Sequence, residues 1–175
     1  MGLVSTVVFA GFGAETAGTG TTAVGSRSET SKLFQAVRTG DVGGLKAAIA
    51  GGADLNGAGT NGLSPLLDLL HNAAGPLDQA QRRCVAYLLE HGGIVDASDK
   101  LGRTPVILAA RLGDLETIRV LVEAEADVKI RDKLHKSALF YAVEAKRRDI
   151  VLYLAANGDL VSFSVKEKKQ LGGKP

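Results

Sequence analysis

A pattern that recurs at a spacing of 33 residues constrains the fold of this chain more than any other feature. The segment Thr104–Ala110 (Thr-Pro-Val-Ile-Leu-Ala-Ala) is matched 33 residues later by Ser137–Val143, and its opening pair is matched upstream by Ser64-Pro65. Periods of roughly 20 to 50 residues indicate supersecondary units that bury their apolar faces only against neighbouring copies. The sequence therefore predicts a linear stack of repeats rather than one rounded core.

One copy of the pattern reads, residue by residue, as two short helices. Gly102 supplies the positive φ of a tight turn, Thr104 lies where a helix N-cap belongs, and Pro105 follows at the first helical position. We expect the side-chain oxygen of Thr104 to cap this helix, and Gly113-Asp114 to end it. A second helix then carries an apolar stripe at helical spacing: Leu115, Ile118, Leu121 and Val122. Helices this short cannot bury a core alone, so they must stack on neighbours.

The stretch Gly102–Ala124, followed by Glu125-Ala126-Asp127-Val128, resembles one complete ankyrin repeat. Similar endings recur in Gly52-Ala53-Asp54-Leu55, Gly92-Gly93-Ile94-Val95 and Asn157-Gly158-Asp159-Leu160. The resemblance implies an all-α solenoid of about four helix-turn-helix repeats with short β-hairpin-like tips. It places the repeats at approximately residues 30–61, 62–101, 102–134 and 135–161, between an N-terminal arm (1–29) and a C-terminal tail (162–175).

Two positions make local predictions about helix starts. The first repeat is expected to begin at Thr30 or Ser31, because either side chain can cap a helix. In the third repeat, Ile107 replaces the histidine that is customary in ankyrin repeats three residues after the threonine. The hydrogen bonds of that histidine are therefore expected to be absent.

The second repeat is longer than the others. It carries seven extra residues, 71–77, which fall between its two helices. Asp78 with Gln81 resembles a capping box for the helix that follows. Insertions in the turns of solenoids are usually tolerated sequence drift, and we interpret this one in that way.

Composition excludes several functional classes. The chain is 45% hydrophobic and 23% charged, as folded proteins are, and its net charge of +2 is too small to argue for a nucleic-acid partner. The single cysteine, Cys84, is expected to be a packed thiol, and it suits a reducing intracellular compartment. No apolar run approaches the roughly 18 residues of a membrane helix. We expect a cytoplasmic location, with a cytoskeletal or organellar assembly as the alternative.

No residue pattern indicates an enzyme. The three histidines, His71, His91 and His135, fall in the inserted turn, at a helix end and in a hairpin, which ankyrin geometry places far apart. Gly11-Phe12-Gly13 lacks the strand-to-helix context of a phosphate-binding loop. We therefore expect no catalytic residue, no cofactor and no metal site.

Positive charge gathers in the segments that are expected to form hairpin tips. In ankyrin-repeat proteins the tips and the face of the first helices commonly form a concave binding surface, so the resemblance places these cations on one edge. We predict a protein-interaction scaffold or adaptor whose partner has an acidic surface. The alternative is that the tips are solvated and tolerate charge without a partner. The predicted contact residues are Lys100, Arg103, Lys129, Arg131, Lys133 and Lys136.

The two ends of the chain suggest a second function. An apolar run at residues 6–12 contains Phe9 and Phe12, and the alternating segment 161–165 contains Phe163, which we expect to pack in an extended strand. These residues would suit a structural accessory subunit that a large assembly holds by its arm and solenoid ends. The chain also opens with a match to the N-myristoylation pattern at Gly2, so lipid-mediated membrane contact is a further alternative for the arm.

Overall fold

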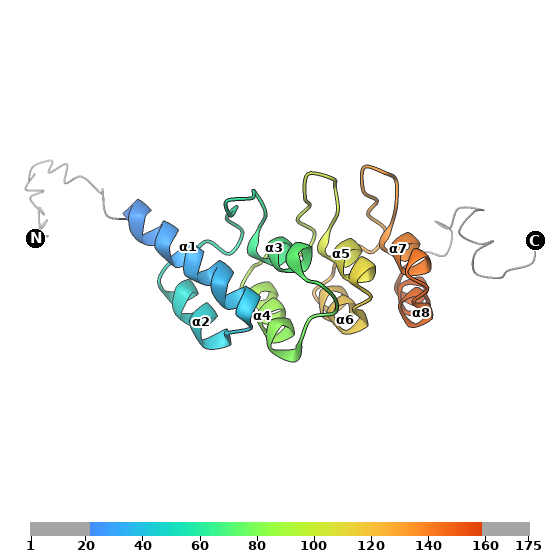
Figure 1. The fold of residues 1–175 in the computed structure, drawn as a ribbon, viewed down its shortest axis with the longest axis horizontal. Helices are drawn as coiled ribbons and strands as arrows, with labels where there is room; N and C mark the ends of the chain where they lie inside the picture. Colours follow the sequence, from blue (N-terminus) through green and yellow to red (C-terminus); the bar gives the residue numbers. More distant parts are fainter. Residues whose placement is uncertain (1–21, 159–175) are drawn as a thin grey trace, which may run out of the picture.

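The computed structural model describes residues 22–158, which form a row of stacked helix pairs (Figure 1). These residues contain eight helices and no strand. In chain order they are α1 (Thr22–Thr39), α2 (Val42–Ala50), α3 (Pro65–Asn72), α4 (Gln79–Glu90), α5 (Pro105–Leu112), α6 (Leu115–Glu123), α7 (Ala138–Glu144) and α8 (Arg148–Asn157). The pairs follow one another along the long axis, which confirms the predicted all-α solenoid.

Two layers of helices run along the stack. The first helices, α1, α3, α5 and α7, lie in the layer next to the long loops, and the second helices lie in the layer below (Figure 1). A continuous core separates the layers, and it includes Leu33, Leu45, Leu67, Leu88, Ile107, Ile118, Leu121 and Ile150. Because each repeat supplies only a few of these side chains, each repeat depends on its neighbours for a core.

Most of the helix starts follow from side-chain capping. Ser64 and Ser137 each accept a hydrogen bond from the backbone N–H three residues further on, at 3.5 and 3.3 Å. Asp78 and Gln81 form the predicted capping box at the start of α4. Each of these caps satisfies an amide that a helix terminus would otherwise leave unpaired.

Thr104 precedes α5 as expected, but the prediction that its side chain caps this helix is wrong. The side chain makes no capping hydrogen bond, and Oγ1 is buried without a partner among the described residues. Ile107, three residues on, is apolar and cannot supply one. Pro105 starts the helix instead, since its fixed φ suits the first helical position, and the carbonyl of Thr104 accepts from the N–H of Leu108 at 3.0 Å.

The first helix begins earlier than predicted. α1 starts at Thr22, so Thr30 and Ser31 lie inside it rather than at its start. The hydroxyl of Ser31 donates to the carbonyl of Arg27 four residues back, at 3.0 Å, which is the bond a serine makes within a helix. An ion pair of 2.7 Å between Lys32 and Glu29 adds helical i,i+3 support. Part of the expected arm, residues 22–29, is therefore helical.

The inserted residues begin within α3, since His71 and Asn72 end that helix, and residues 73–77 lie between α3 and α4. They are bonded to the third repeat. Leu77 is buried, and its N–H donates to Oδ2 of Asp114 at 2.7 Å. The same carboxylate, only 2% exposed, accepts from the N–H and the hydroxyl of Thr117 at 3.1 and 2.6 Å. Arg82 lies 3.7 Å from Asp114 and also bonds the carbonyl of Leu77. The insertion is thus part of the packing between two repeats.

Candidate functional site

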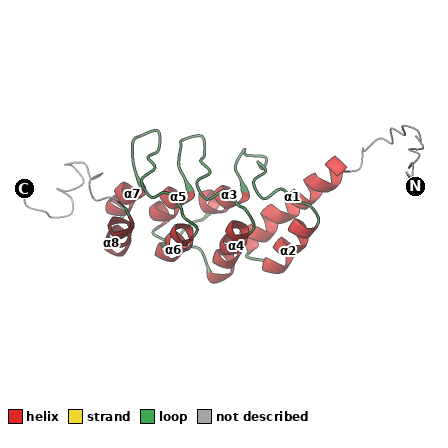
Figure 2. Ribbon diagram, turned by 180° about the vertical axis from the view of Figure 1, so that it is seen from behind, coloured by secondary structure: helices red, strands yellow, loops and turns green. Residues whose placement is uncertain are grey.

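Three loops project from one edge of the stack and carry the predicted contact residues. They join each second helix to the next first helix and span residues 51–64, 91–104 and 124–137 (Figure 2). The first loop contains no lysine or arginine, whereas the second contains two and the third four. Positive charge therefore increases along the row of tips towards the C-terminal end.

An aspartate closes each of the two charged tips. Oδ1 of Asp99 accepts from the N–H of Leu101 at 2.8 Å, and Oδ1 of Asp132 accepts from the N–H of Leu134 at 2.8 Å. The backbone N–H of each aspartate also bonds a carbonyl on the opposite arm of its tip, at 3.1 and 3.0 Å. His135 takes the left-handed conformation, φ 59°, that Gly102 takes in the preceding tip. The tips are consequently fixed by backbone bonds.

Neighbouring tips are also joined to each other. The N–H of Lys133 donates to the carbonyl of Leu101 at 2.9 Å. Nearer the helices, the N–H of Asp127 donates to the carboxylate of Asp96 at 3.2 Å. The second and third loops therefore present one rigid surface, and little conformational entropy remains to be lost when a partner binds there.

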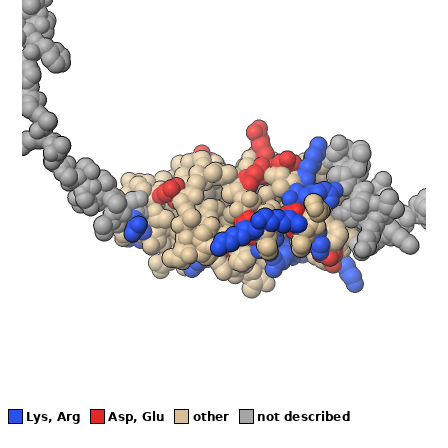
Figure 3. Space-filling model, turned by 90° about the horizontal axis from the view of Figure 1, so that it is seen from above, with Lys and Arg blue, Asp and Glu red and all other residues tan. Residues whose placement is uncertain are grey.

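The predicted cations differ in how far they are exposed. Lys100, Lys129, Arg131 and Lys133 are exposed, and a view onto the loops shows Lys and Arg gathered over the C-terminal half of this face (Figure 3). The guanidinium of Arg131 donates to the carbonyl of His135 at 2.8 Å, which holds it at the tip. These exposed groups can attract an anionic surface over a distance set by the salt concentration.

Arg103 and Lys136 are engaged within the chain. The side chain of Arg103 is only 12% exposed, and it pairs with Asp99 at 2.6 Å and contacts Nδ1 of His71 at 3.3 Å. Burial disfavours the charged form of Asp99, but the hydrogen bonds and charge of Arg103 outweigh it and lower the pKa of that carboxyl. Lys136 bonds Glu144 at 3.3 Å and lies 4.4 Å from the centre of the Phe140 ring. Both side chains therefore make contacts within the chain that stabilise the tips and the adjoining helices.

Two leucines also belong to this surface, although the pattern of charged residues in the sequence did not identify them. Leu101 and Leu134 stand 33 residues apart, at equivalent places in successive tips, and are 51% and 66% exposed. Each directly follows a lysine, Lys100 or Lys133. The spacing of the Lys-Leu pairs is visible in the sequence, so the repeat period itself could have revealed them.

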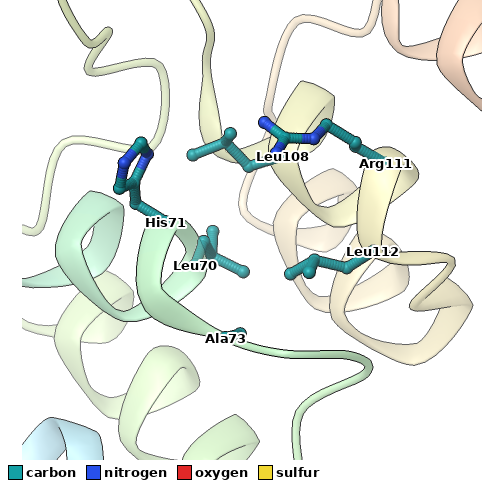
Figure 4. Close-up of a pocket in the computed structure, with 6 residues that line it drawn as sticks. All are labelled: Leu70, His71, Ala73, Leu108, Arg111 and Leu112. Carbon is teal, nitrogen blue, oxygen red and sulfur yellow. The ribbon is translucent and has the colours of Figure 1, made fainter.

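Away from the tips, three features bear on whether the chain holds a chemical site: a small hollow, the metal-ligating residue types and the single cysteine. A hollow between α3 and α5, lined by Leu70, His71, Ala73, Leu108, Arg111 and Leu112, has a volume of about 30 Å³, room for one water (Figure 4). No three His, Cys, Asp or Glu residues within 22–158 gather closely enough to hold a metal ion. Burial, with smaller contributions from Asp41 and Asp78, raises the pKa of the Cys84 thiol to about 11, so it is a poor nucleophile.

Four predicted residues lie outside residues 22–158: Gly2, Phe9, Phe12 and Phe163. The contacts proposed for them remain predictions. Among the described helices, none is both long and apolar enough to cross a bilayer.

Comparison with known proteins agrees with this architecture. A family model of ankyrin repeats (3 copies) matches residues 33–132 and 70–164. The chain is 31% identical over 101 residues to ankyrin repeat domain-containing protein 63 of Mus musculus, covering 57% of this chain and 23% of that protein. It is 31% identical over 128 residues to neurogenic locus notch homolog protein 2 of Homo sapiens, covering 72% and 5%. It is 29% identical over 103 residues to the E3 ubiquitin-protein ligase XB3 of Oryza sativa subsp. japonica, covering 59% and 22%.

The chain thus spans less than a quarter of the length of each of these relatives. Ankyrin repeats are in general protein–protein interaction modules, and the family is typically not enzymatic. The family model covers most of the described solenoid. This chain belongs to the ankyrin-repeat family.

Proposed function

We propose that this protein is an interaction scaffold or adaptor that binds an acidic protein partner through the second and third tips and the adjoining face of the first helices. The observation that carries the proposal is the joined pair of tips, which presents four exposed cations on a backbone held by hydrogen bonds. Its single buried cysteine suits action in a reducing intracellular compartment.

Charge placement supports an acidic partner. The carboxylates of Asp99 and Asp132 accept the backbone bonds that close the two tips, and Asp99 pairs with Arg103 rather than with an exposed lysine. Exposed ion pairs contribute little to the stability of a fold. Cations at this edge therefore cost the fold little and act mainly on the rate and specificity of association.

The test is charge reversal at the third tip, with a matched control. Lys129→Glu, Arg131→Glu and Lys133→Glu are combined in one protein, and Arg27→Glu, Arg83→Glu and Arg148→Glu in another, since the latter three arginines are exposed away from the tips. Affinity purification with mass spectrometry should show proteins that the wild type and the control capture and the tip variant loses. Capture that survives tip reversal at physiological salt would move the interface elsewhere.

A second candidate function rests on the end of the stack. Leu152 on α8 is 62% exposed where no further repeat covers it within the described residues. A structural accessory subunit would be held at such an end and by the arm. Deleting residues 1–21 and replacing Leu152 by Ser should then abolish assembly, while tip reversal leaves assembly intact.

A further inference from the structure

We propose that the segment recognised by the two charged tips is acidic and also carries bulky apolar side chains, which pack on Leu101 and Leu134. This inference rests on the proposed function and narrows it to one class of partner. The exposed leucines of the tips are the basis of this inference, because the cations alone would be satisfied by a partner without apolar side chains.

The two leucines are fixed by the same bond in both tips. Each donates its backbone N–H to the aspartate two residues before it, at 2.8 Å. The carbonyl of Leu101 accepts from Lys133 in the next tip. These bonds hold the backbone of each leucine at the tip, where the two residues are 51% and 66% exposed. Apolar surface that is exposed in this way contributes favourable free energy only when a partner covers it and removes it from water.

The leucines do not serve the fold. The core lies between the helix layers, and neither Leu101 nor Leu134 belongs to it or to the side chains packed against it. Four large apolar side chains are exposed within residues 22–158, and two of them occupy these equivalent tip positions. A lysine precedes each one, so a covering segment must satisfy a cation and an apolar side chain together, twice, one repeat apart.

This combination favours a protein segment over a nucleic acid. A phosphate backbone would pair with the lysines but leave the leucines in water, because single-stranded bases stack on aromatic rings. The third loop, residues 124–137, contains no aromatic ring of Phe, Tyr or Trp. Carboxylates that alternate with leucine-like side chains would cover both kinds of group.

The experiment uses two synthetic fluorescein-labelled peptides of equal charge and the full chain. One repeats Glu-Glu-Leu and the other Glu-Glu-Ser, each over roughly twelve residues, since an extended chain rises about 3.3 Å per residue and repeats pack about 10 Å apart. Fluorescence anisotropy at physiological salt should show the leucine peptide binding about tenfold more tightly than the serine peptide, a difference of about 1.4 kcal/mol.

Variants of the tips assign that difference to residues. The double variant Leu101→Ser, Leu134→Ser should lose the preference for the leucine peptide, while its affinity for the serine peptide stays unchanged. Leu152→Ser is the matched control, because that leucine is equally exposed but lies on α8. The double variant Lys100→Gln, Lys133→Gln should bind both peptides more weakly. Thermal melts of all variants should coincide with that of the wild type, since none of these side chains is in the core.

Three outcomes overturn the inference. They are equal affinity for the two peptides, no binding of either peptide, and binding of a single-stranded RNA of equal charge as tight as that of the leucine peptide. None of the three alone refutes the proposed function, which fails only if the tip-reversed protein keeps all the partners that the wild type captures.

Discussion

The buried hydroxyl of Thr104 should be a source of instability, and Thr104→Val should stabilise the protein. Residue 104 is 1% exposed, and its Oγ1 has no hydrogen-bond partner among residues 22–158. Its backbone, φ −86° and ψ 166°, is extended, which a β-branched residue adopts readily. Valine has nearly the same shape and replaces the unpaired hydroxyl by a methyl group. The substitution should therefore remove a desolvation cost without creating a cavity.

The magnitude follows from the cost of an unpaired polar group. Burying a hydroxyl without a hydrogen bond costs about 1–3 kcal/mol in proteins. Because no capping bond is lost, Thr104→Val should raise the free energy of unfolding by about 1 kcal/mol. For a domain of this size that corresponds to a rise in Tm of about 4 °C. A serine or threonine that does cap a helix behaves in the opposite way on removal.

Urea and thermal unfolding, followed by circular dichroism, measure the change. The matched control is Ser137→Ala, since Ser137 accepts from Phe140 at 3.3 Å and its loss should cost about 1 kcal/mol. The two variants should shift the unfolding midpoint in opposite directions. If Thr104→Val destabilises the protein as much as the control does, the hydroxyl has a partner in solution and the reasoning fails.

Three further predictions concern other parts of the chain. Asp114→Ala should lower the free energy of unfolding by about 3 kcal/mol, because it leaves buried hydrogen-bond donors without an acceptor. Asp41→Ala removes a cap at an exposed position and should lower it by about 1 kcal/mol in the same urea titration. Burial and the bond to Asp132 raise the pKa of Tyr141 to about 12, so stability should fall as pH rises from about 10 towards 12; ultraviolet titration of the phenolate checks this, and Tyr141→Phe should abolish it. Deleting residues 161–175 should lower Tm or solubility if that segment packs on the stack, and an unchanged melt would contradict the packing.

The repeat period predicts the fold well because it reports which segments are equivalent. The helix pairs, the place of the inserted residues 71–77 and the capping box at Asp78 all follow from it or from local capping chemistry. The start of α1 does not, since Thr30 and Ser31 have cap chemistry but lie inside a longer helix. A capping side chain also bonds well within a helix, so local chemistry cannot decide between the two.

The candidate surface is less readable from sequence, because residue type does not show which charges are already paired. Arg103 counts as a surface cation by type, yet Asp99 holds it at 2.6 Å within the tip. Thr104 is a helix cap by position, yet its hydroxyl makes no capping bond and finds no partner among the described residues. Both outcomes depend on contacts that a one-dimensional pattern does not contain.

The link from Leu77 to Asp114 changes how the stack should come apart. In a repeat protein each unit is stabilised by its neighbours alone, so unfolding can begin at either end and spread inward. The bonds from the inserted loop add coupling at one interface only, between the second and third repeats. These bonds therefore oppose separation of the second and third repeats, so that opening of one of them should loosen the other. The two charged tips precede and follow the third repeat, so both adjoin a repeat that the inserted loop fastens to its neighbour.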